Sequence, residues 1–133
     1  MTAQLSPLAR FDNLLLATDG SEISQGAVRA ALHMASRCGS RLTVMHMART
    51  LPDYAMFNPE GVRQAEDQGR AVLQEVERQA GTDCVNCAPV LRHGEEPVHE
   101  IVAQAEESAA DVVIMGRRGV HWLERLMLGE AAA

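Results

Sequence analysis

Short apolar runs alternate along this chain with longer segments in which apolar residues recur every three or four positions. The runs fall in Phe11–Thr18, Arg41–Met47, Val90–Arg92 and Asp111–Met115. A short, continuously apolar run is typical of a strand that is buried on both faces of a parallel sheet. We therefore predict four strands at these positions.

The intervening segments predict helices. The first spans about Ser24–Cys38, with Gly39 at the place where a left-handed cap would end it. The second spans about Glu60–Ala80 and is closed by Gly81, because its apolar residues keep a helical spacing with charged residues between them.

A third helix is predicted to begin at Pro97, since proline suits the first turn of a helix. Its residues Ile101, Val102 and Ala105 are expected to face the core. Strands that alternate with helices at this spacing favour right-handed β-α-β units, and hence an α/β domain with one doubly wound, mainly parallel sheet. With 133 residues, of which 47% are apolar, the chain is long enough for one core and too short for two, so residues 1–133 are expected to form a single domain.

Composition argues against several classes of protein. The chain carries 18 acidic and 12 basic residues, and its formal net charge of −6 argues against binding to nucleic acid or to an anionic membrane. No apolar stretch approaches the roughly 20 residues that a membrane-spanning helix needs, and the amino terminus lacks a signal pattern, so we expect a cytoplasmic protein. All 12 basic residues are arginine, so neither a P-loop lysine nor a Schiff-base lysine is available.

The three cysteines, without a secretory signal, fit reduced thiols better than a disulfide framework. Cys84 and Cys87 form a Cys-x-x-Cys pair, and His93 and His99 follow, a spacing compatible with a zinc site. The alternative, which we favour, is that this pair simply flanks the start of the third strand, with Cys38 near the end of a helix, since small apolar thiols are common in such places.

A glycine motif directly follows the last apolar run. Gly116 and Gly119 enclose two arginines, and Gly129 follows after nine further residues. Glycines at the end of a buried strand let backbone N–H groups turn toward a bound anion, so the motif predicts a phosphate cradle at the carboxyl edge of the sheet. Asp19 and Met47 follow the first two strands, and the carboxyl ends of parallel strands share one edge. We expect the three segments to meet in one crevice.

Four pieces of the sequence share their order with a known family. They are Ala17-Thr18-Asp19-Gly20-Ser21-Glu22 at the end of the first strand, His46-Met47 at the end of the second, the turn Gly94-Glu95-Glu96-Pro97, and Met115-Gly116-x-x-Gly119 with Gly129 after nine more residues. From about Phe11 to its end the chain resembles the universal stress protein family, in the branch that binds ATP through a Gly-x2-Gly-x9-Gly motif. The resemblance implies a Rossmann-like fold of the adenine nucleotide alpha hydrolase-like group.

The resemblance also implies roles for individual residues. Asp19, with Ala17 and Thr18, would hold the adenine and ribose, and Met47 would pack on the base. Backbone amides of the motif glycines would face the phosphates of ATP, bound with or without Mg²⁺, or of ADP or AMP. The full set implied to bind the nucleotide is Ala17, Thr18, Asp19, Met47, Met115, Gly116, Arg117, Arg118, Gly119, Gly129 and Glu130.

Several of these residues also have a plainer interpretation. Asp19 could instead stabilise a turn or cap the first helix, and Met47 could simply be part of the core. Arg117 and Arg118 could pair with phosphate oxygens, or one of them could lie in a solvated turn. His46 is expected to be a strand histidine with its hydrogen bonds satisfied.

The sequence departs from the family pattern in two places. Glu130 stands where the family has a serine or threonine, and a carboxylate about 4 Å from a phosphate costs about 1–4 kcal/mol. Glu130 could instead turn outward at the start of a helix, where a carboxylate is favourable. The sequence ends at Ala133, before the last helix and strand of the family, so we expect both to be lacking. The last strand commonly makes the family's dimer contact; self-association, as a homodimer, is still expected.

Two functions of different classes are compatible with these features. The first is a nucleotide-binding stress-response protein, in which ATP changes what the protein binds. The second is an interaction module of the same fold that binds no nucleotide; Glu130 favours it, and the intact glycine spacing opposes it. Enzymes of the wider adenine nucleotide alpha hydrolase-like group are a weaker alternative, since their Ser-Gly-Gly-x-Asp-Ser signature is absent. No nucleophile has a convincing paired base, so we expect no catalysis beyond slow ATP hydrolysis.

Overall fold

The computed structural model describes residues 11–49 and 56–116. Its elements, in chain order, are β1 (Asn13–Ala17), α1 (Gln25–Cys38), β2 (Arg41–Arg49), α3 (Pro59–Thr82), β3 (Asn86–Gly94), α4 (Pro97–Glu107) and β4 (Val112–Met115). The strands form one sheet in the order β3-β2-β1-β4, and each neighbouring pair is parallel. The predicted α/β fold with a doubly wound parallel sheet is therefore confirmed. The expected lack of a last helix and strand concerns the chain after Gly116, which lies outside the described residues.

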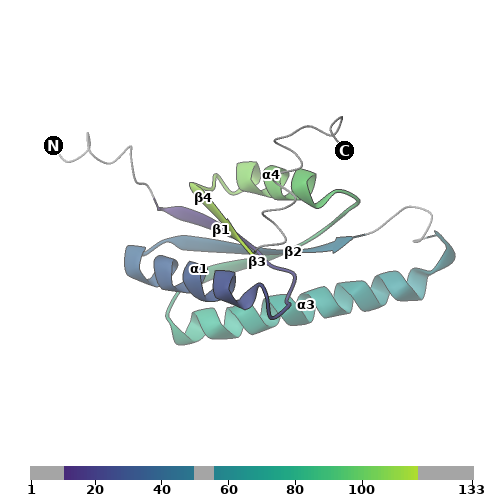
Figure 1. Cartoon of the computed structure of the whole chain (residues 1–133), viewed down its shortest axis with the longest axis horizontal. Helices are drawn as coiled ribbons and strands as arrows, with labels where there is room; N and C mark the ends of the chain where they lie inside the picture. Colours follow the sequence, from purple (N-terminus) through teal and green to yellow (C-terminus); the bar gives the residue numbers. More distant parts are fainter. Residues whose placement is uncertain (1–10, 50–55, 117–133) are drawn as a thin grey trace.

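Helices cover both faces of the sheet, with α1 and α3 on one face and α4 on the other (Figure 1). Leu14 and Leu16 of β1 pack into a cluster with α1 and α3, whereas Leu15 packs against Met45 and Ile101 on the α4 side. All three leucines are at most 1% exposed, because successive side chains of a central strand point to opposite, covered faces. The continuous apolar run in the sequence thus reflects burial on both faces.

β3 is longer than the segment Val90–Arg92 that the sequence pattern predicted, since it spans nine residues, Asn86–Gly94. It lies at an edge of the described sheet and pairs there with β2 alone, so none of its side chains is fully buried and no continuous apolar run marks it. Pro89 lies within the strand, where an edge position tolerates a residue without an N–H group.

Two details of helix ends and faces differ from prediction. α3 continues through Gly81 and ends with Asp83 as its cap, so Gly81 is not the residue that closes it. Val102 is 40% exposed rather than core-facing, because it lies about 100° around α4 from the buried Ile101. Gly39, in contrast, caps α1 with a φ of 66°, in the left-handed conformation that the sequence predicted.

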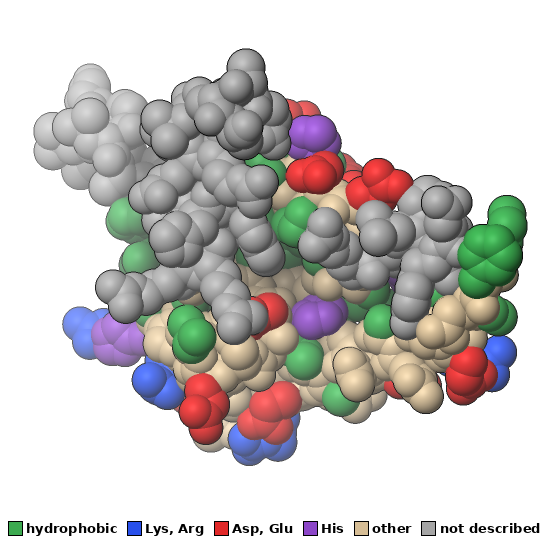
Figure 2. Space-filling model, turned by 45° about the vertical axis from the view of Figure 1, so that its right-hand side comes forward, with side chains coloured by type: hydrophobic (Ala, Val, Ile, Leu, Met, Phe, Trp, Pro, Cys, Tyr) green, Lys and Arg blue, Asp and Glu red, His purple; other side chains and the backbone are tan. Residues whose placement is uncertain are grey.

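Three ion pairs lie within α3. Each ion pair joins an acidic residue to an arginine three positions later: Glu60–Arg63, Asp67–Arg70 and Glu75–Arg78. On the face that Figure 2 shows, arginine side chains lie apart from one another at the edges rather than gathered into one basic field. Within the described ranges, no helix is long and apolar enough to cross a membrane.

One arginine ties α4 to the sheet. Arg92 of β3 donates hydrogen bonds from Nε to Glu100 Oε1 at 2.9 Å, and from Nη1 to Gln104 Oε1 at 2.8 Å and Glu107 Oε2 at 2.6 Å. These three acceptors follow one another along one side of α4, and the Arg92 side chain is only 21% exposed. Hydrogen bonds to Glu107, the larger cause, and to Glu100 raise the pKa of Arg92, so its side chain stays positively charged. Together with the buried Val98 and Ile101, this single guanidinium holds the only helix that covers this face among the described elements.

We predict that Arg92→Met lowers the free energy of unfolding by about 1–3 kcal/mol. The half-buried Glu100 and the buried Gln104 would lose their common donor, whereas methionine keeps much of the packing of the arginine stem. Urea denaturation followed by circular dichroism measures the change. Arg78→Met is the matched control, because Arg78 pairs with Glu75 on the exposed side of α3 and its loss should change stability little. Equal losses in the two variants would contradict the role given to Arg92.

Candidate functional site

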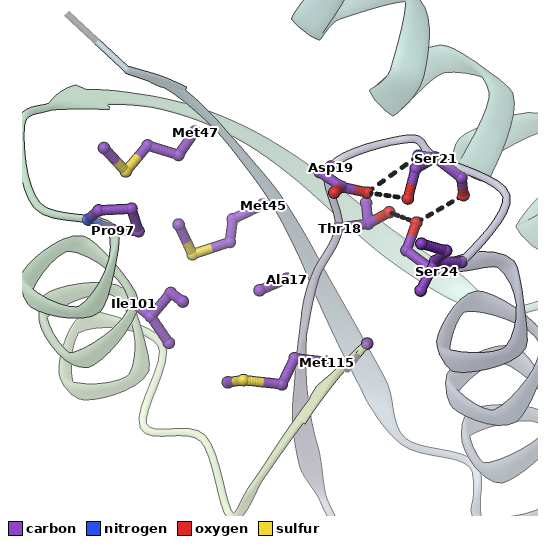
Figure 3. Close-up of a pocket in the computed structure, with 12 residues that line it drawn as sticks. Ala17, Thr18, Asp19, Ser21, Ser24, Met45, Met47, Pro97, Ile101 and Met115 are labelled. Atoms are coloured by element: carbon purple, nitrogen blue, oxygen red, sulfur yellow. Dashed lines mark hydrogen bonds between the residues drawn. The ribbon is translucent and has the colours of Figure 1, made fainter. Parts of the chain in front are cut away.

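A pocket lies at the carboxyl ends of β1, β2 and β4, beside the start of α4 (Figure 3). Its cavity volume is about 60 Å³. The lining residues are Ala17, Thr18, Asp19, Ser21, Ile23, Ser24, Met45, Met47, Pro97, Ile101, Met115 and Gly116. Open α/β sheets bind their ligands at this edge, beside the neighbouring strands whose connecting helices lie on opposite faces of the sheet.

The floor of the pocket is a row of side chains across three strands. Ala17 of β1 pairs in register with Met45 of β2 on one side and with Met115 of β4 on the other. Residues paired in register point to the same face of a sheet, so a methyl group lies between two long thioethers and leaves a hollow there. Met47, two residues after Met45, extends this apolar floor (Figure 3). Flexible, polarisable thioethers around a hollow suit a flat apolar ring.

The loop after β1 forms a chain of hydrogen bonds along one wall. Gly20 N donates to Thr18 Oγ1 at 3.1 Å, Thr18 Oγ1 lies 3.0 Å from Ser24 Oγ, and Ser24 Oγ donates to the Ser21 carbonyl at 2.9 Å. A hydroxyl has one hydrogen, and Ser24 gives its hydrogen to Ser21. Thr18 must therefore be the donor in its bond to Ser24. Both hydroxyl groups are buried, and each is satisfied within the protein.

Thr18 is engaged through its backbone as well. Its N–H group donates to the Met45 carbonyl at 3.1 Å, and its carbonyl accepts from His46 Nδ1 at 3.0 Å. The expectation that His46 is a strand histidine with a hydrogen-bond partner is confirmed for Nδ1. Because every polar group of Thr18 already has a protein partner, we infer that Thr18 positions the loop rather than offering its hydroxyl hydrogen to a ligand.

Asp19 stabilises the turn that follows. Its Oδ1 accepts hydrogen bonds from Ser21 N at 2.9 Å and from Ser21 Oγ at 2.6 Å. The first turn of α1 begins after Ser24, beyond these bonds, so Asp19 does not cap the helix directly. The turn-stabilising interpretation of Asp19 is thus confirmed, and a contact with ligand stays a prediction.

Two glycines let the loop and the strand end approach their neighbours closely. Gly20 has a φ of 79°, and a Cβ atom there would lie 2.5 Å from Val72 Cγ2 of α3, so both the conformation and the space require glycine. At Gly116 a Cβ atom would lie 3.2 Å from Ser24 Cα, so the end of β4 packs directly against the start of α1. The first glycine of the proposed cradle therefore has a packing role of its own.

The structure brings together every predicted site residue that it describes. Those around the pocket are Ala17, Thr18, Asp19, Met47, Met115 and Gly116. The predicted residues outside the described part of the chain are Arg117, Arg118, Gly119, Gly129 and Glu130. The pocket residues that were not predicted as site residues are Ser21, Ile23, Ser24, Met45, Pro97 and Ile101. Their place depends on strand register and helix packing; only the turn before Pro97 gave a signal that α4 starts here.

The zinc alternative finds no support in the structure. Among residues 11–49 and 56–116, no three His, Cys, Asp or Glu side chains are grouped so that they could hold a metal ion. His93 lies beside Glu66 of α3, with Nε2 2.8 Å from Oε2. Burial, and then the charge of Glu77, raise the pKa of the Cys87 thiol to about 11, which disfavours the thiolate that a metal needs.

We predict that Thr18→Val lowers the free energy of unfolding by about 1–3 kcal/mol, because the Gly20 N–H group and the buried Ser24 hydroxyl each lose a partner in a side chain of nearly unchanged shape. Urea denaturation measures the loss. Thr82→Val is the matched control, since Thr82 makes one 3.3 Å bond on an exposed surface and its replacement should have little effect. A loss no greater than that of the control would mean that the hydroxyl chain does not stabilise the loop.

Comparison with known proteins places this geometry in a family. The sequence model of the Universal stress protein family matches residues 10–133. The universal stress protein YxiE of Bacillus subtilis is 27% identical over 135 residues, which cover 92% of this chain and 89% of the relative.

Solved structures agree with that match. A protein of the universal stress protein family from Burkholderia pseudomallei has a TM-score of 0.71 at 29% identity, covering 88% of each chain. A universal stress protein in complex with cAMP has a TM-score of 0.57 at 22% identity, covering 79% of this chain and 71% of that one. Since the family model spans most of its length, this chain belongs to the universal stress protein family.

Proposed function

We propose that this protein binds an adenine nucleotide, ATP above all, in the pocket at the carboxyl edge of the sheet, and that the bound nucleotide changes which protein it associates with during stress. The observation that carries the proposal is the hollow at Ala17 between Met45 and Met115, directly beside a polar turn. A small apolar slot with a few polar groups at its rim is the usual design of a site for a small ligand.

In this proposal the base lies over the hollow and packs on Met47. Asp19, at the rim, accepts hydrogen bonds from ribose hydroxyls, and the phosphates extend past Gly116 along the glycine motif, with or without Mg²⁺. The predicted contacts of Arg117, Arg118, Gly119, Gly129 and Glu130 belong to the same proposal. The cAMP complex of a family member supports it at the level of the fold alone, because that protein is 22% identical to this chain.

The second candidate is an interaction module that works without nucleotide. Two observations favour it. The cavity of about 60 Å³ is well below the roughly 300–1,000 Å³ of typical small-molecule sites, so it would enclose only part of a nucleotide. The hydroxyl groups of Thr18 and Ser24 are also fully bonded without a ligand. Under either candidate we propose a cytoplasmic homodimer, and under the first we propose no catalysis beyond slow ATP hydrolysis.

Isothermal titration of ATP with Mg²⁺ into the protein tests the first candidate. We expect micromolar affinity, and absence of binding would favour the interaction module. A parallel titration of Glu130→Ser distinguishes two possible causes of an absence of ATP binding. Recovery of binding in this variant would mean that one carboxylate opposes the phosphates, whereas failure of both proteins would argue against a nucleotide site.

We predict that Ala17→Leu weakens ATP binding by about tenfold or more, because the larger side chain fills the hollow between the two methionines and removes a buried apolar contact of the base. The same titration measures the loss, and circular dichroism checks that the variant folds. Val102→Leu is the matched control, since it also enlarges an aliphatic side chain on this side of the sheet but lies 40% exposed and outside the pocket. Unchanged affinity in a folded Ala17→Leu protein would place the nucleotide elsewhere.

A further inference from the structure

Three thioether side chains meet in this one pocket. Figure 3 shows the sulfur-bearing side chains of Met45 and Met47 from β2 and of Met115 from β4 extending into the same space. Their access to solvent differs, since Met45 is 1% exposed whereas Met47 and Met115 are partly exposed. A reagent small enough to enter the pocket would therefore reach Met47 and Met115 before Met45.

We propose that Met47 and Met115 are an oxidation site at which a peroxide makes the pocket polar and thereby releases its ligand. In each reaction the sulfur attacks one peroxide oxygen and the O–O bond breaks. The sulfur gains that oxygen atom and gives up two electrons, and the second oxygen leaves as water, so that thioether and hydrogen peroxide become sulfoxide and water. The effect on the ligand rests on the proposed nucleotide site; the modification itself does not.

The side chains around the methionines offer no hydrogen-bond donor to a sulfoxide oxygen. The side chains of Ala17, Pro97 and Ile101, which line the space beside the methionines, carry no hydrogen-bond donor. The pocket's hydroxyl hydrogens are already used, from Thr18 to Ser24, from Ser24 to the Ser21 carbonyl, and from Ser21 to Asp19. A new buried acceptor without a donor is unfavourable, so an oxidised side chain would turn toward the mouth of the pocket, where the ligand enters.

The thiols do not compete for this role. No cysteine lines the pocket. Cys38 ends α1 and Cys84 precedes β3, which places both at the amino edge of the strands, opposite the pocket. Cys87, the second residue of β3, lies at the same edge. The pKa of its thiol is raised to about 11, which keeps the thiol in the less reactive protonated form. Oxidation of a thiol would therefore change a different part of the surface.

Hydrogen peroxide treatment of the whole protein, followed by removal of the peroxide, peptide mass spectrometry and ATP titration, tests the proposal. Met56, which is 74% exposed, should gain an oxygen atom first, Met47 and Met115 next, and Met45 last. Affinity for ATP should fall about five- to a hundredfold, as for a buried polar group without a partner, and methionine sulfoxide reductases should restore it.

Two variants separate the pocket methionines from other targets. Met47→Leu/Met115→Leu keeps side-chain volume and all three cysteines, so its affinity before and after peroxide should be the same, whatever its starting value. Met56→Leu should still lose affinity on treatment, because Met56 lies outside the pocket.

The outcomes also distinguish this proposal from the proposed function. If the untreated protein binds no ATP, the proposed nucleotide site is wrong. The oxidation site is then tested by the midpoint temperature of thermal unfolding. This temperature should fall after peroxide treatment in the parent and not in the double variant. The proposal is overturned if Met47 and Met115 stay unmodified when Met56 is fully oxidised. If the untreated protein binds ATP, the proposal is equally overturned when both methionines are modified and ATP affinity does not change. If it binds no ATP, the proposal is overturned when both are modified and the midpoint temperature of thermal unfolding does not change.

Discussion

The parallel pairing of β1 with both of its neighbours is the constraint on which the rest of the molecule depends. β1 is only five residues long, yet it pairs with β2 on one side and β4 on the other; β1 and β4 end at the same level, and β2 continues past them to Arg49. That register places Ala17 between Met45 and Met115 and delivers the Thr18–Ser21 turn to the same edge. A shift of one residue in either pairing would turn the methionines to the opposite face, where α1 and α3 pack, and the pocket would lose its floor.

The two faces of the sheet differ in how they are covered, and the pocket depends on that difference. On one face α1 and α3 bury a large cluster of leucine, valine and alanine side chains. On the other, the described structure offers α4 alone, held by the Arg92 guanidinium, over a smaller cluster of Leu15, Met45 and Ile101. Because α4 starts beside the carboxyl edge and packs over only part of this face, space is left between Pro97, Ile101 and the ends of the strands.

The pocket combines a rigid wall with an adaptable floor. The wall is fixed by the hydroxyl chain from Thr18 to Ser24, by the Asp19 turn and by the close contact of Gly20 with Val72, so its polar groups have little freedom to rearrange. The floor consists of methionine side chains, which change rotamer easily and contribute polarisable surface. A ligand would therefore be oriented by the rim and accommodated by the floor, and chemical change at the methionine sulfur atoms would act on the part of the site that can move.

The sequence by itself determined the order of strands and helices, the parallel α/β fold, the left-handed cap at Gly39 and the edge at which Asp19, Met47 and Gly116 meet. These features follow from local periodicity and from the rule that parallel strands share a carboxyl edge. Only the tertiary structure decided the full length of β3, the outward position of Val102, the role of Met45 in the floor and the engagement of every polar group of Thr18. Each of these depends on partners distant in sequence, because exposure, register and hydrogen-bond partners are set by which elements pack together, and neither composition nor spacing along the chain encodes that packing directly.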